Sequence, residues 1–426
     1  MAALIVVPLY FDIYSSRVFE PDKLSLLRSL ALVMVGVWIV RQIELKLRLR
    51  PNGNGNAAPR PALIERARAA LRENPLLIPT WFTVVVYIIS TVFSVTVSVS
   101  FWGSYQRMQG TYTTLSYIVI FLMAVGSLRT RVQFNRAVNT ILATAFPIGL
   151  YGIMQHFQFD PLPWAGDVTI RVASNMGNSI FVAAYLIMVL PLALARWLET
   201  VTQWSTESGQ TLRARVVYIV IALVMLGLSL ALWLTDFTLG AVYTVLLFPL
   251  AYLIAPMLNA GPRSTLLVAT YTNILSALLM TIFYSQSRGP WIGLASGLFL
   301  FVVIYALTRR AWGVVFGAFG LGALGFAFLV LFNLPNSPLA PLKSFPYVGR
   351  LGSIFDPNEG SGKVRELIWQ GDVPLILPHE PLWAPTTGDD VLNAIRPLVG
   401  YGPEAMYVVY NRYYPPDLAH YESRNA

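Results

Sequence analysis

Long apolar runs recur along this chain, and they limit what it can fold into more than any other feature. About ten runs of roughly 20 residues, the length that an α-helix needs to cross a bilayer, follow one another between residues 24 and 332. The chain is 56% hydrophobic and 12% charged, whereas about a quarter of the residues in a soluble domain are charged. We therefore predict an all-α polytopic membrane protein with about ten complete transmembrane helices.

The predicted spans leave two flanking segments. The spans cover residues 24–40, 76–99, 113–128, 137–154, 179–194, 216–234, 237–257, 266–283, 291–307 and 313–332. Residues 1–12 are apolar but too short to span, and we interpret them as a partial transmembrane helix whose beginning is missing. Residues 333–426 are predicted to form a large extracytoplasmic loop domain with short helices at 363–370, 391–395 and 403–412. This domain is expected to be incomplete, because no closing helix follows it.

Basic residues gather in alternate loops. The loops assigned to the inside hold eight, three, three, one and two Lys or Arg, seventeen in all, while the outer loops between Arg28 and residue 333 hold only Arg107, Arg171 and Arg288. This asymmetry follows the positive-inside rule, so it explains the net charge of +9 better than nucleic-acid binding does. It predicts insertion in the cytoplasmic (inner) membrane, with the basic loop 41–75 inside and the large loop outside.

Three smaller observations complete this outline. Residues 62–72 form either a short amphipathic helix on the anionic leaflet or a solvated run of charges. The chain has no cysteine, which excludes disulfides and thiolate metal sites. Arg28 lies close enough to the outer end of its span to snorkel to the interface.

Arg288 is the most informative polar residue. It stands in the turn Tyr284-Ser285-Gln286-Ser287-Arg288-Gly289-Pro290-Trp291, between two predicted spans. A cation at the mouth of a membrane bundle is costly unless it meets an anion. Guanidinium groups stay charged and bind phosphate oxygens through a bidentate fork. The sequence therefore predicts that Arg288 binds a lipid phosphate or diphosphate.

Other outer arginines are candidates for the same anion. They are Arg107, Arg171, Arg350 and Arg365. The alternative, for Arg107 and Arg171 in particular, is an arginine that snorkels to the interface from a helix end. The outer segments lack the spacings of a Cys₂His₂-like or carboxylate-rich metal site, so we expect neither a metal nor another cofactor.

Two features of the large loop have a functional and a structural interpretation. Trp369 follows Arg365 by one helical turn and either stacks on that arginine or on a sugar, or packs in a core. Gly400 and Gly402 predict a sharp turn, after which Pro403 is expected to begin a helix that carries Glu404. A purely structural turn is the alternative.

Candidate bases are numerous. A histidine accepts a proton from a hydroxyl near neutral pH without a large pKa shift, and the chain has His156, His379 and His420. Any single histidine is more often a surface or packing residue than a base. The outer carboxylates are Asp160, Asp167, Asp236, Glu366, Glu380 and Glu404, and the sequence does not rank them.

The order and placement of these motifs resemble the bacterial O-antigen ligase/polymerase family of integral membrane glycosyltransferases. The matching residues are Ser287 to Gly293, the turn at Gly177-Asn178, Arg365 with Trp369, and Pro397 to Pro403. The resemblance implies that Arg288 and Arg365 hold a diphosphate, with Arg107 and Arg350 as further candidates. It also implies a late catalytic histidine. His420 stands near the expected place, without the Asn that follows this histidine in the family.

The family's reaction moves a glycan from an undecaprenyl-diphosphate carrier to an acceptor hydroxyl at the outer face of the membrane. The implied partners are the lipid-linked glycan, an acceptor glycolipid, glycan or protein, and membrane lipids. Polysaccharide polymerase and protein O-oligosaccharyltransferase are alternatives within the family. A flippase of lipid-linked oligosaccharide and a non-enzymatic scaffold are alternatives from other classes. The chain has no strong internal repeat and few charges within its spans, which disfavours a transporter, and Thr235 and Asp236 are the nearest hint of a polar path.

Overall fold

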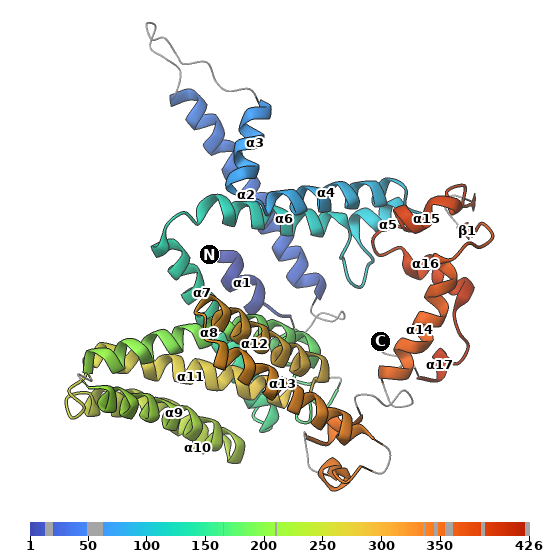
Figure 1. The fold of residues 1–426 in the computed structure, drawn as a ribbon. Coiled ribbons are helices and arrows are strands. Elements are labelled where there is room, and N and C mark those ends of the chain that lie inside the picture. The colour runs from blue at the N-terminus through green and yellow to red at the C-terminus, as the bar shows by residue number, and fades with distance from the viewer. Residues whose placement is uncertain are drawn as a thin grey trace, which may run out of the picture. The chain divides into compact units, whose positions relative to one another are not determined.

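The chain folds almost entirely into helices (Figure 1). The computed structural model describes residues 1–12, 20–48, 63–164, 166–208, 211–334, 337–344, 348–353, 361–384 and 388–421. Within them the strands are two residues long: β1 (Trp383–Ala384) pairs antiparallel with β2 (Gly388–Asp389). The chain is an all-α polytopic membrane protein, as the sequence predicts.

Within the described residues, eight helices are long and apolar enough to cross a membrane. They are α2 (Glu20–Arg48), α7 (Arg131–His156), α8 (Ser179–Ser208), α9 (Leu212–Thr235), α10 (Phe237–Ile254), α11 (Pro262–Tyr284), α12 (Arg288–Thr308) and α13 (Trp312–Asn333). The two remaining predicted spans correspond to shorter apolar helices, α4 (Leu77–Val92) and α6 (Thr111–Ser127). Predicted spans and observed helices therefore agree in number and order.

One predicted span is interrupted. The run 76–99 was expected to be continuous, but α4 ends at Val92 and a separate helix, α5 (Val97–Trp102), follows. The break arises because residues of the large loop form hydrogen bonds with the backbone between α4 and α5. Arg396 Nη1 donates to the carbonyl oxygen of Phe93 at 2.5 Å, and the amide of Val95 donates to the carbonyl oxygen of Tyr401 at 3.1 Å.

The basic loop also differs from the expectation. Helix α2 continues through Arg48, well into the segment 41–75. A second helix, α3 (Leu63–Glu73), occupies the part for which the amphipathic interpretation predicted a helix. Residues 49–62 lie outside the described part of the chain.

By packing, the chain divides into two compact units. The first unit comprises Met1–Ser15 and Val132–Asp356, and the second comprises Ser16–Arg131 and Pro357–Ala426. The sequence-based division at 24–332 and 333–426 follows hydropathy instead of packing and stays a prediction. We describe each unit by itself.

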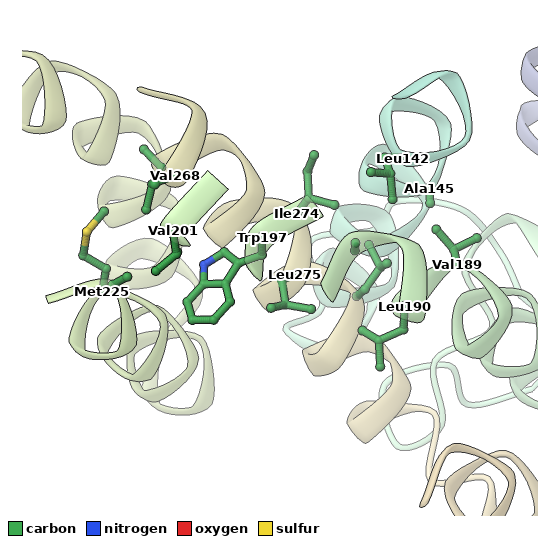
Figure 2. Packing of buried hydrophobic residues seen from close by; sticks show 14 of the residues in the cluster. Leu142, Ala145, Val189, Leu190, Trp197, Val201, Met225, Val268, Ile274 and Leu275 are labelled. Atoms are coloured by element: carbon green, nitrogen blue, oxygen red, sulfur yellow. The ribbon is translucent and has the colours of Figure 1, made fainter. Parts of the chain in front are cut away.

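Helix α11 forms the core of the first unit. The most apolar stretch of α11 is 67% buried inside the protein, whereas that of α13 is 6% buried. Helix α11 packs against α8, α9 and α10. Figure 2 shows Leu275 of this helix in the same packed cluster as Trp197 of α8. Trp197 Nε1 donates to Thr272 Oγ1 at 3.0 Å, and Thr281 Oγ1 donates to the carbonyl oxygen of Gly149 at 2.6 Å. Since lipid cannot satisfy buried polar groups, these bonds fix α11 against α7 and α8.

Three connections of the first unit meet at one end. Tyr284 Oη donates to the carbonyl oxygen of Trp233 at 2.7 Å, which ties the end of α11 to the end of α9. The amide of Val172, in the loop between α7 and α8, donates to the carbonyl oxygen of Tyr284 at 3.3 Å. The charge pattern assigns these same connections to one side of the membrane.

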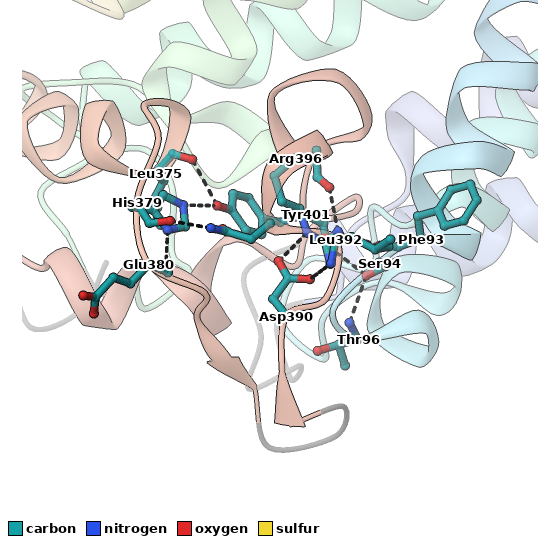
Figure 3. Close-up of polar contacts among 12 residues, drawn as sticks. Phe93, Ser94, Thr96, Leu375, His379, Glu380, Asp390, Leu392, Arg396 and Tyr401 are labelled. Atoms are coloured by element: carbon teal, nitrogen blue, oxygen red, sulfur yellow. Dashed lines mark hydrogen bonds and ion pairs between the residues drawn. The ribbon is translucent and has the colours of Figure 1, made fainter.

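The second unit is organised around a buried ion pair. Its loop elements are α14 (Ser361–Ile376), η4 (Asn393–Ile395), α15 (Arg396–Val399), α16 (Met406–Tyr410), η5 (Asn411–Tyr413) and α17 (Leu418–Tyr421). Arg396 binds Asp390 through two contacts, Nε to Oδ2 at 2.6 Å and Nη2 to Oδ1 at 2.7 Å (Figure 3). Both side chains are 3% exposed. The same guanidinium donates to the carbonyl oxygen of Gly400 at 2.9 Å, so one arginine joins three backbone segments.

The turn at Gly400 to Gly402 docks onto the break between α4 and α5. Both glycines adopt positive φ, +69° and +107°. Ser94 Oγ donates to the carbonyl oxygen of Tyr401 at 3.0 Å. The expected helix start at Pro403 is wrong, because Glu404 has a φ of +55° and α16 begins only at Met406. The carboxylate of Glu404 accepts a hydrogen bond from the backbone amide of Ser104 instead.

A substitution at Gly402 tests this docking. A Cβ there would overlap the hydroxyls of Ser94 and Ser100, and its φ is one that L-residues rarely adopt. We expect Gly402→Ala to weaken the docking by about 1–3 kcal/mol, measured as faster hydrogen exchange at the amide of Val95. In the control Gly297→Ala, the new Cβ meets nothing within 4 Å, and this exchange should not change. Unaltered exchange in Gly402→Ala would contradict the docking.

Candidate functional site

Serines shape the turn between α11 and α12. Ser285 Oγ donates to the carbonyl oxygen of Ile282 at 2.7 Å, and the amide of Ser287 donates to Ser285 Oγ at 3.3 Å. Gln286 adopts a φ of +49° and lets the chain reverse within a few residues. Ser287 is the N-cap of α12 but makes no side-chain cap bond. The amide of Trp291 donates to the carbonyl oxygen of Ser287 at 3.2 Å, and Arg288 stands at the positive end of the α12 dipole, which favours an anion.

Arg171 reaches this turn from the loop between α7 and α8. Its Nη2 donates to Ser287 Oγ at 3.5 Å, and the neighbouring amide of Val172 binds the carbonyl oxygen of Tyr284. Arg171 is half-buried. The loop therefore brings a second guanidinium to the start of α12.

The turn at Gly177-Asn178 anchors the same loop. Gly177 adopts a φ of +72°, and Asn178 Oδ1 accepts a hydrogen bond from the amide of Ile180 at 2.8 Å, next to the start of α8. In η1 (Ser174–Met176), Asn175 Nδ2 donates to the carbonyl oxygen of Pro8 at 2.7 Å and so holds the end of α1 (Ala2–Leu9). These contacts give the motif a structural role in positioning Arg171.

Arg350 arrives from the segment that follows α13. Its short helix η3 (Val348–Ser353) is tied to α13 by Asn333 Nδ2, which donates to the carbonyl oxygen of Leu351 at 2.8 Å. Arg350 Nη1 donates to the carbonyl oxygen of Gln286 at 2.9 Å. A third guanidinium thus lies at the turn.

We call Arg171, Arg288 and Arg350 the arginine cluster. Burial lowers the pKa of Arg171, and the charges of Arg350 and Arg288 lower it further; burial and the charge of Arg288 lower the pKa of Arg350. Both remain protonated, since arginine titrates far above neutral pH. Within the described part of the chain, Arg171 and Arg350 donate to neutral oxygens, and Arg171 Nε is buried without a partner. Cations gathered in this way favour a multiply charged anion.

The cluster contains three of the five arginines that the sequence offered as anion ligands, Arg171, Arg288 and Arg350, of which the family resemblance had singled out Arg288 and Arg350. Arg107 and Arg365 are exposed and belong to the second unit. The predicted clamp between Arg288 and Arg365 stays a prediction, because its members lie in units that are described separately. In the sequence, the signal for Arg171 is that it is the only basic residue of its outer loop, and snorkelling explained that signal equally well.

Arg28 corrects one expectation. It was expected to snorkel, but it is buried, at 6% exposure. Its Nε donates to Thr113 Oγ1 at 2.7 Å, and its Nη2 donates to the carbonyl oxygens of Trp102 and Met108, both at 2.6 Å. Its guanidinium carbon lies 4.8 Å from the ring centre of Tyr112. Arg28 therefore holds the turn before α6 and has a structural role.

Trp369 lies on α14 with Arg365, one helical turn away. Its side chain is 67% exposed, so the interpretation as a core residue is wrong. An exposed indole on the loop that is predicted to lie outside retains the capacity to stack on a sugar, and this role stays a prediction.

The three histidines differ in their surroundings. His420 is exposed on the four-residue helix α17. Both ring nitrogens of His379 are engaged, Nδ1 with a backbone carbonyl at 2.6 Å and Nε2 with Tyr401 Oη at 2.8 Å (Figure 3). The ring of His156 stacks on Tyr284 with centroids 3.7 Å apart. His156 is thus the histidine beside the turn that carries the arginine cluster.

Three predicted carboxylates of the first unit have structural bonds. Asp236 caps α10 by accepting from the amide of Leu239 at 2.9 Å, which gives it a role other than lining a transport path. Asp167 accepts from the side chain and the backbone of Thr169, and these bonds lower its pKa. Asp160 accepts four hydrogen bonds of 2.7–3.1 Å, from Tyr151 Oη, Gln155 Nε2, Trp164 Nε1 and the amide of Leu162. The oxygens of Asp160 therefore hold the loop that follows α7.

No family model, no curated protein and no solved structure matches the chain. Among the described residues, no group of three or more His, Cys, Asp or Glu side chains comes together.

Proposed function

We propose that this protein is an O-antigen ligase-like glycosyltransferase. It takes a glycan from an undecaprenyl-diphosphate carrier and transfers it to an acceptor hydroxyl at the outer face of the cytoplasmic membrane. The observation that carries the proposal is the arginine cluster at the start of α12. The resemblance of Ser287 to Gly293 to the O-antigen ligase/polymerase family supports the same substrate class.

The arginine cluster suits a diphosphate leaving group. When the bond between the anomeric carbon and the diphosphate breaks, negative charge develops on the departing oxygen. Guanidinium groups fixed in advance stabilise that charge without reorganising, which is the largest contribution in many enzymes. The start of α12 is the positive end of the helix dipole, which favours the same negative charge.

The exposure of α12 supports a lipid-linked donor. Only 11% of the most apolar stretch of α12 is buried inside the protein, so most of this helix has an exposed apolar surface. A headgroup bound at Arg288 would leave its isoprenoid tail beside that surface, where hydrocarbon is well solvated by lipid. A soluble sugar nucleotide has no such tail to place.

Reconstitution tests the proposal. Purified protein in phospholipid vesicles is mixed with a lipid-diphosphate-linked glycan and an acceptor glycolipid. We expect the glycan to appear on the acceptor while one equivalent of undecaprenyl diphosphate is released. Movement of the intact donor across the bilayer would favour a flippase instead. A donor that is neither transferred nor moved would contradict both activities.

A further inference from the structure

A groove runs between α4 and α6 of the second unit, and basic residues lie at one of its ends. We propose that this groove binds one chain of an anionic phospholipid, whose headgroup meets Arg68 and Arg72 of α3. The site involves neither the arginine cluster nor the proposed glycosyl transfer, so it stands or falls by itself.

The lining of the groove suits a hydrocarbon chain. The groove has a volume of about 340 Å³, and its lining includes Leu76 and Pro79 at the start of α4 and Phe121 on α6. Thr80 and Thr83 also line it, but their hydroxyls donate to the carbonyl oxygens of Leu76 and Pro79, each at 2.8 Å. These bonds satisfy both hydroxyls within α4, so neither threonine needs a polar ligand.

The direction of the two helices determines which end of the groove α3 meets. Thr91 near the end of α4 contacts Thr111 at the start of α6, with their hydroxyl oxygens 2.5 Å apart. Helices α4 and α6 pack side by side (Figure 1). The start of α4 therefore lies beside the end of α6, and Leu76, the N-cap of α4, lines this end of the groove.

Helix α3 brings exposed arginines to the same end. Only three residues, Asn74 to Leu76, separate α3 from α4, and the amide of Leu77 donates to the carbonyl oxygen of Asn74 at 3.0 Å. Arg72 stands in the last turn of α3, just before this short connection, and Arg68 precedes it by one helical turn on the same face. Both arginines are exposed.

The charges at this end favour an anion. Arg129 follows the end of α6 at Ser127 and is a third exposed arginine there. Glu65 and Glu73 of α3 oppose this charge, but among the described side chains the arginines outnumber them. Basic groups beside the ends of transmembrane helices attract anionic lipid headgroups. A soluble anion would leave the apolar groove unfilled, whereas an anionic phospholipid satisfies both the groove and its basic end.

Photo-crosslinking tests the site. The full chain is reconstituted in phosphatidylcholine vesicles that contain phosphatidylglycerol with a photoreactive acyl chain, and the labelled positions are mapped by mass spectrometry. We expect the label to concentrate on residues 76–83 and 117–121. A phosphatidylcholine probe with the same acyl chain should label them at least about fivefold less, the contribution of one basic group near the membrane surface. Added salt should weaken labelling by the phosphatidylglycerol probe, because exposed charges are screened.

Substitutions separate the headgroup from the chain. The double variant Arg68→Gln/Arg72→Gln should lower labelling by the phosphatidylglycerol probe roughly tenfold and leave the phosphatidylcholine probe unchanged. Glu73→Gln, which removes a negative charge from the same end, should raise it. Thr83→Trp, which fills the groove, should lower labelling of α6 by both probes. The matched control is Arg213→Gln, an exposed arginine at the start of α9 in the first unit, which should change neither probe.

Three results would overturn the proposal. They are equal labelling by the two probes, labelling spread evenly over exposed apolar helices such as α13, and unchanged labelling in the double arginine variant. Displacement of the probe by undecaprenyl phosphate but not by phosphatidylglycerol would assign the groove to an isoprenoid chain and would also overturn it. The arginine substitutions lie on an exposed helix, so they test the headgroup site whether or not Thr83→Trp folds.

Discussion

Replacing Arg288 with lysine is expected to lower kcat/KM for glycan transfer roughly 100- to 1,000-fold, the scale on which one donor to developing negative charge acts. Lysine keeps the positive charge at the start of α12 but lacks the planar fork that binds two phosphate oxygens at once. Arg171 and Arg350 do not replace this fork, because each already donates a hydrogen bond to the turn itself. Steady-state rates with a purified lipid-linked donor measure the effect.

The matched control is Arg309→Lys, at the opposite end of the same helix. Arg309 lies just after α12, with its guanidinium carbon 5.5 Å from the ring centre of Tyr305. This substitution changes the same chemical group away from the arginine cluster, and we expect a rate within about twofold of wild type. Equal rates for Arg288→Lys and the wild-type protein would remove Arg288 from the site.

Asp390→Asn is expected to have the largest effect on stability. It leaves Arg396 buried without its carboxylate, and breaking a buried ion pair by removing one partner costs about 3–5 kcal/mol. Because Arg396 also binds the carbonyl oxygens of Phe93 and Gly400, we expect the whole docked turn to lose stability. Hydrogen exchange at the amide of Val95, which donates to the docked turn, reports the free energy of local opening.

A surface ion pair in the same unit provides the control. Lys363 and Glu366 on α14 are 24% and 45% exposed, and their side chains approach to 3.1 Å. Exposed pairs contribute about 0–1 kcal/mol, so Glu366→Gln should leave exchange at Val95 nearly unchanged. Equal effects of Glu366→Gln and Asp390→Asn would contradict the central role of the buried pair.

The pH dependence of this pair has a definite sign. Burial alone would raise the pKa of Asp390, but the hydrogen bonds and charge of Arg396 outweigh it, and the pKa lies below its ordinary value. A depressed pKa in the folded state contributes stability that is fully present above the unfolded value of about 4 and is lost as the pH falls through the folded value. Protection at Val95, corrected for intrinsic exchange, should therefore fall below about pH 4, and this step should be absent from Asp390→Asn.

Hydropathy and charge were sufficient to predict the helices but not where they break. Ten apolar runs became ten apolar helices because the cost of exposing backbone to lipid applies to every span alike. The end of α4 at Val92 was not predictable locally, since it depends on Arg396, 303 positions beyond Phe93. The prediction that placed Glu404 in a helix failed for the same reason, since its contact with Ser104 spans 300 positions.

The candidate site, like the fold, could be predicted only in part from the sequence. Arg288 was identifiable because a cation in a tight turn between spans needs an anion. Arg28 and Arg171 had similar local signals at the ends of spans, yet the structure buries Arg28 against backbone carbonyls and places Arg171 in the arginine cluster. Among the three histidines the resemblance favoured His420, whose catalytic role stays a prediction, whereas the stacking of His156 on Tyr284 depends on contacts that the sequence does not show.

The most direct test of the arginine cluster compares two lipids that differ by one phosphate. Purified protein is titrated with undecaprenyl diphosphate and with undecaprenyl phosphate at fixed ionic strength. We predict that the diphosphate binds at least about tenfold more tightly, a difference of about 1.4 kcal/mol, and that Arg288→Gln abolishes this preference. Equal affinities for the two lipids, or a preference that survives in Arg288→Gln, would contradict the assignment of the cluster as a diphosphate site.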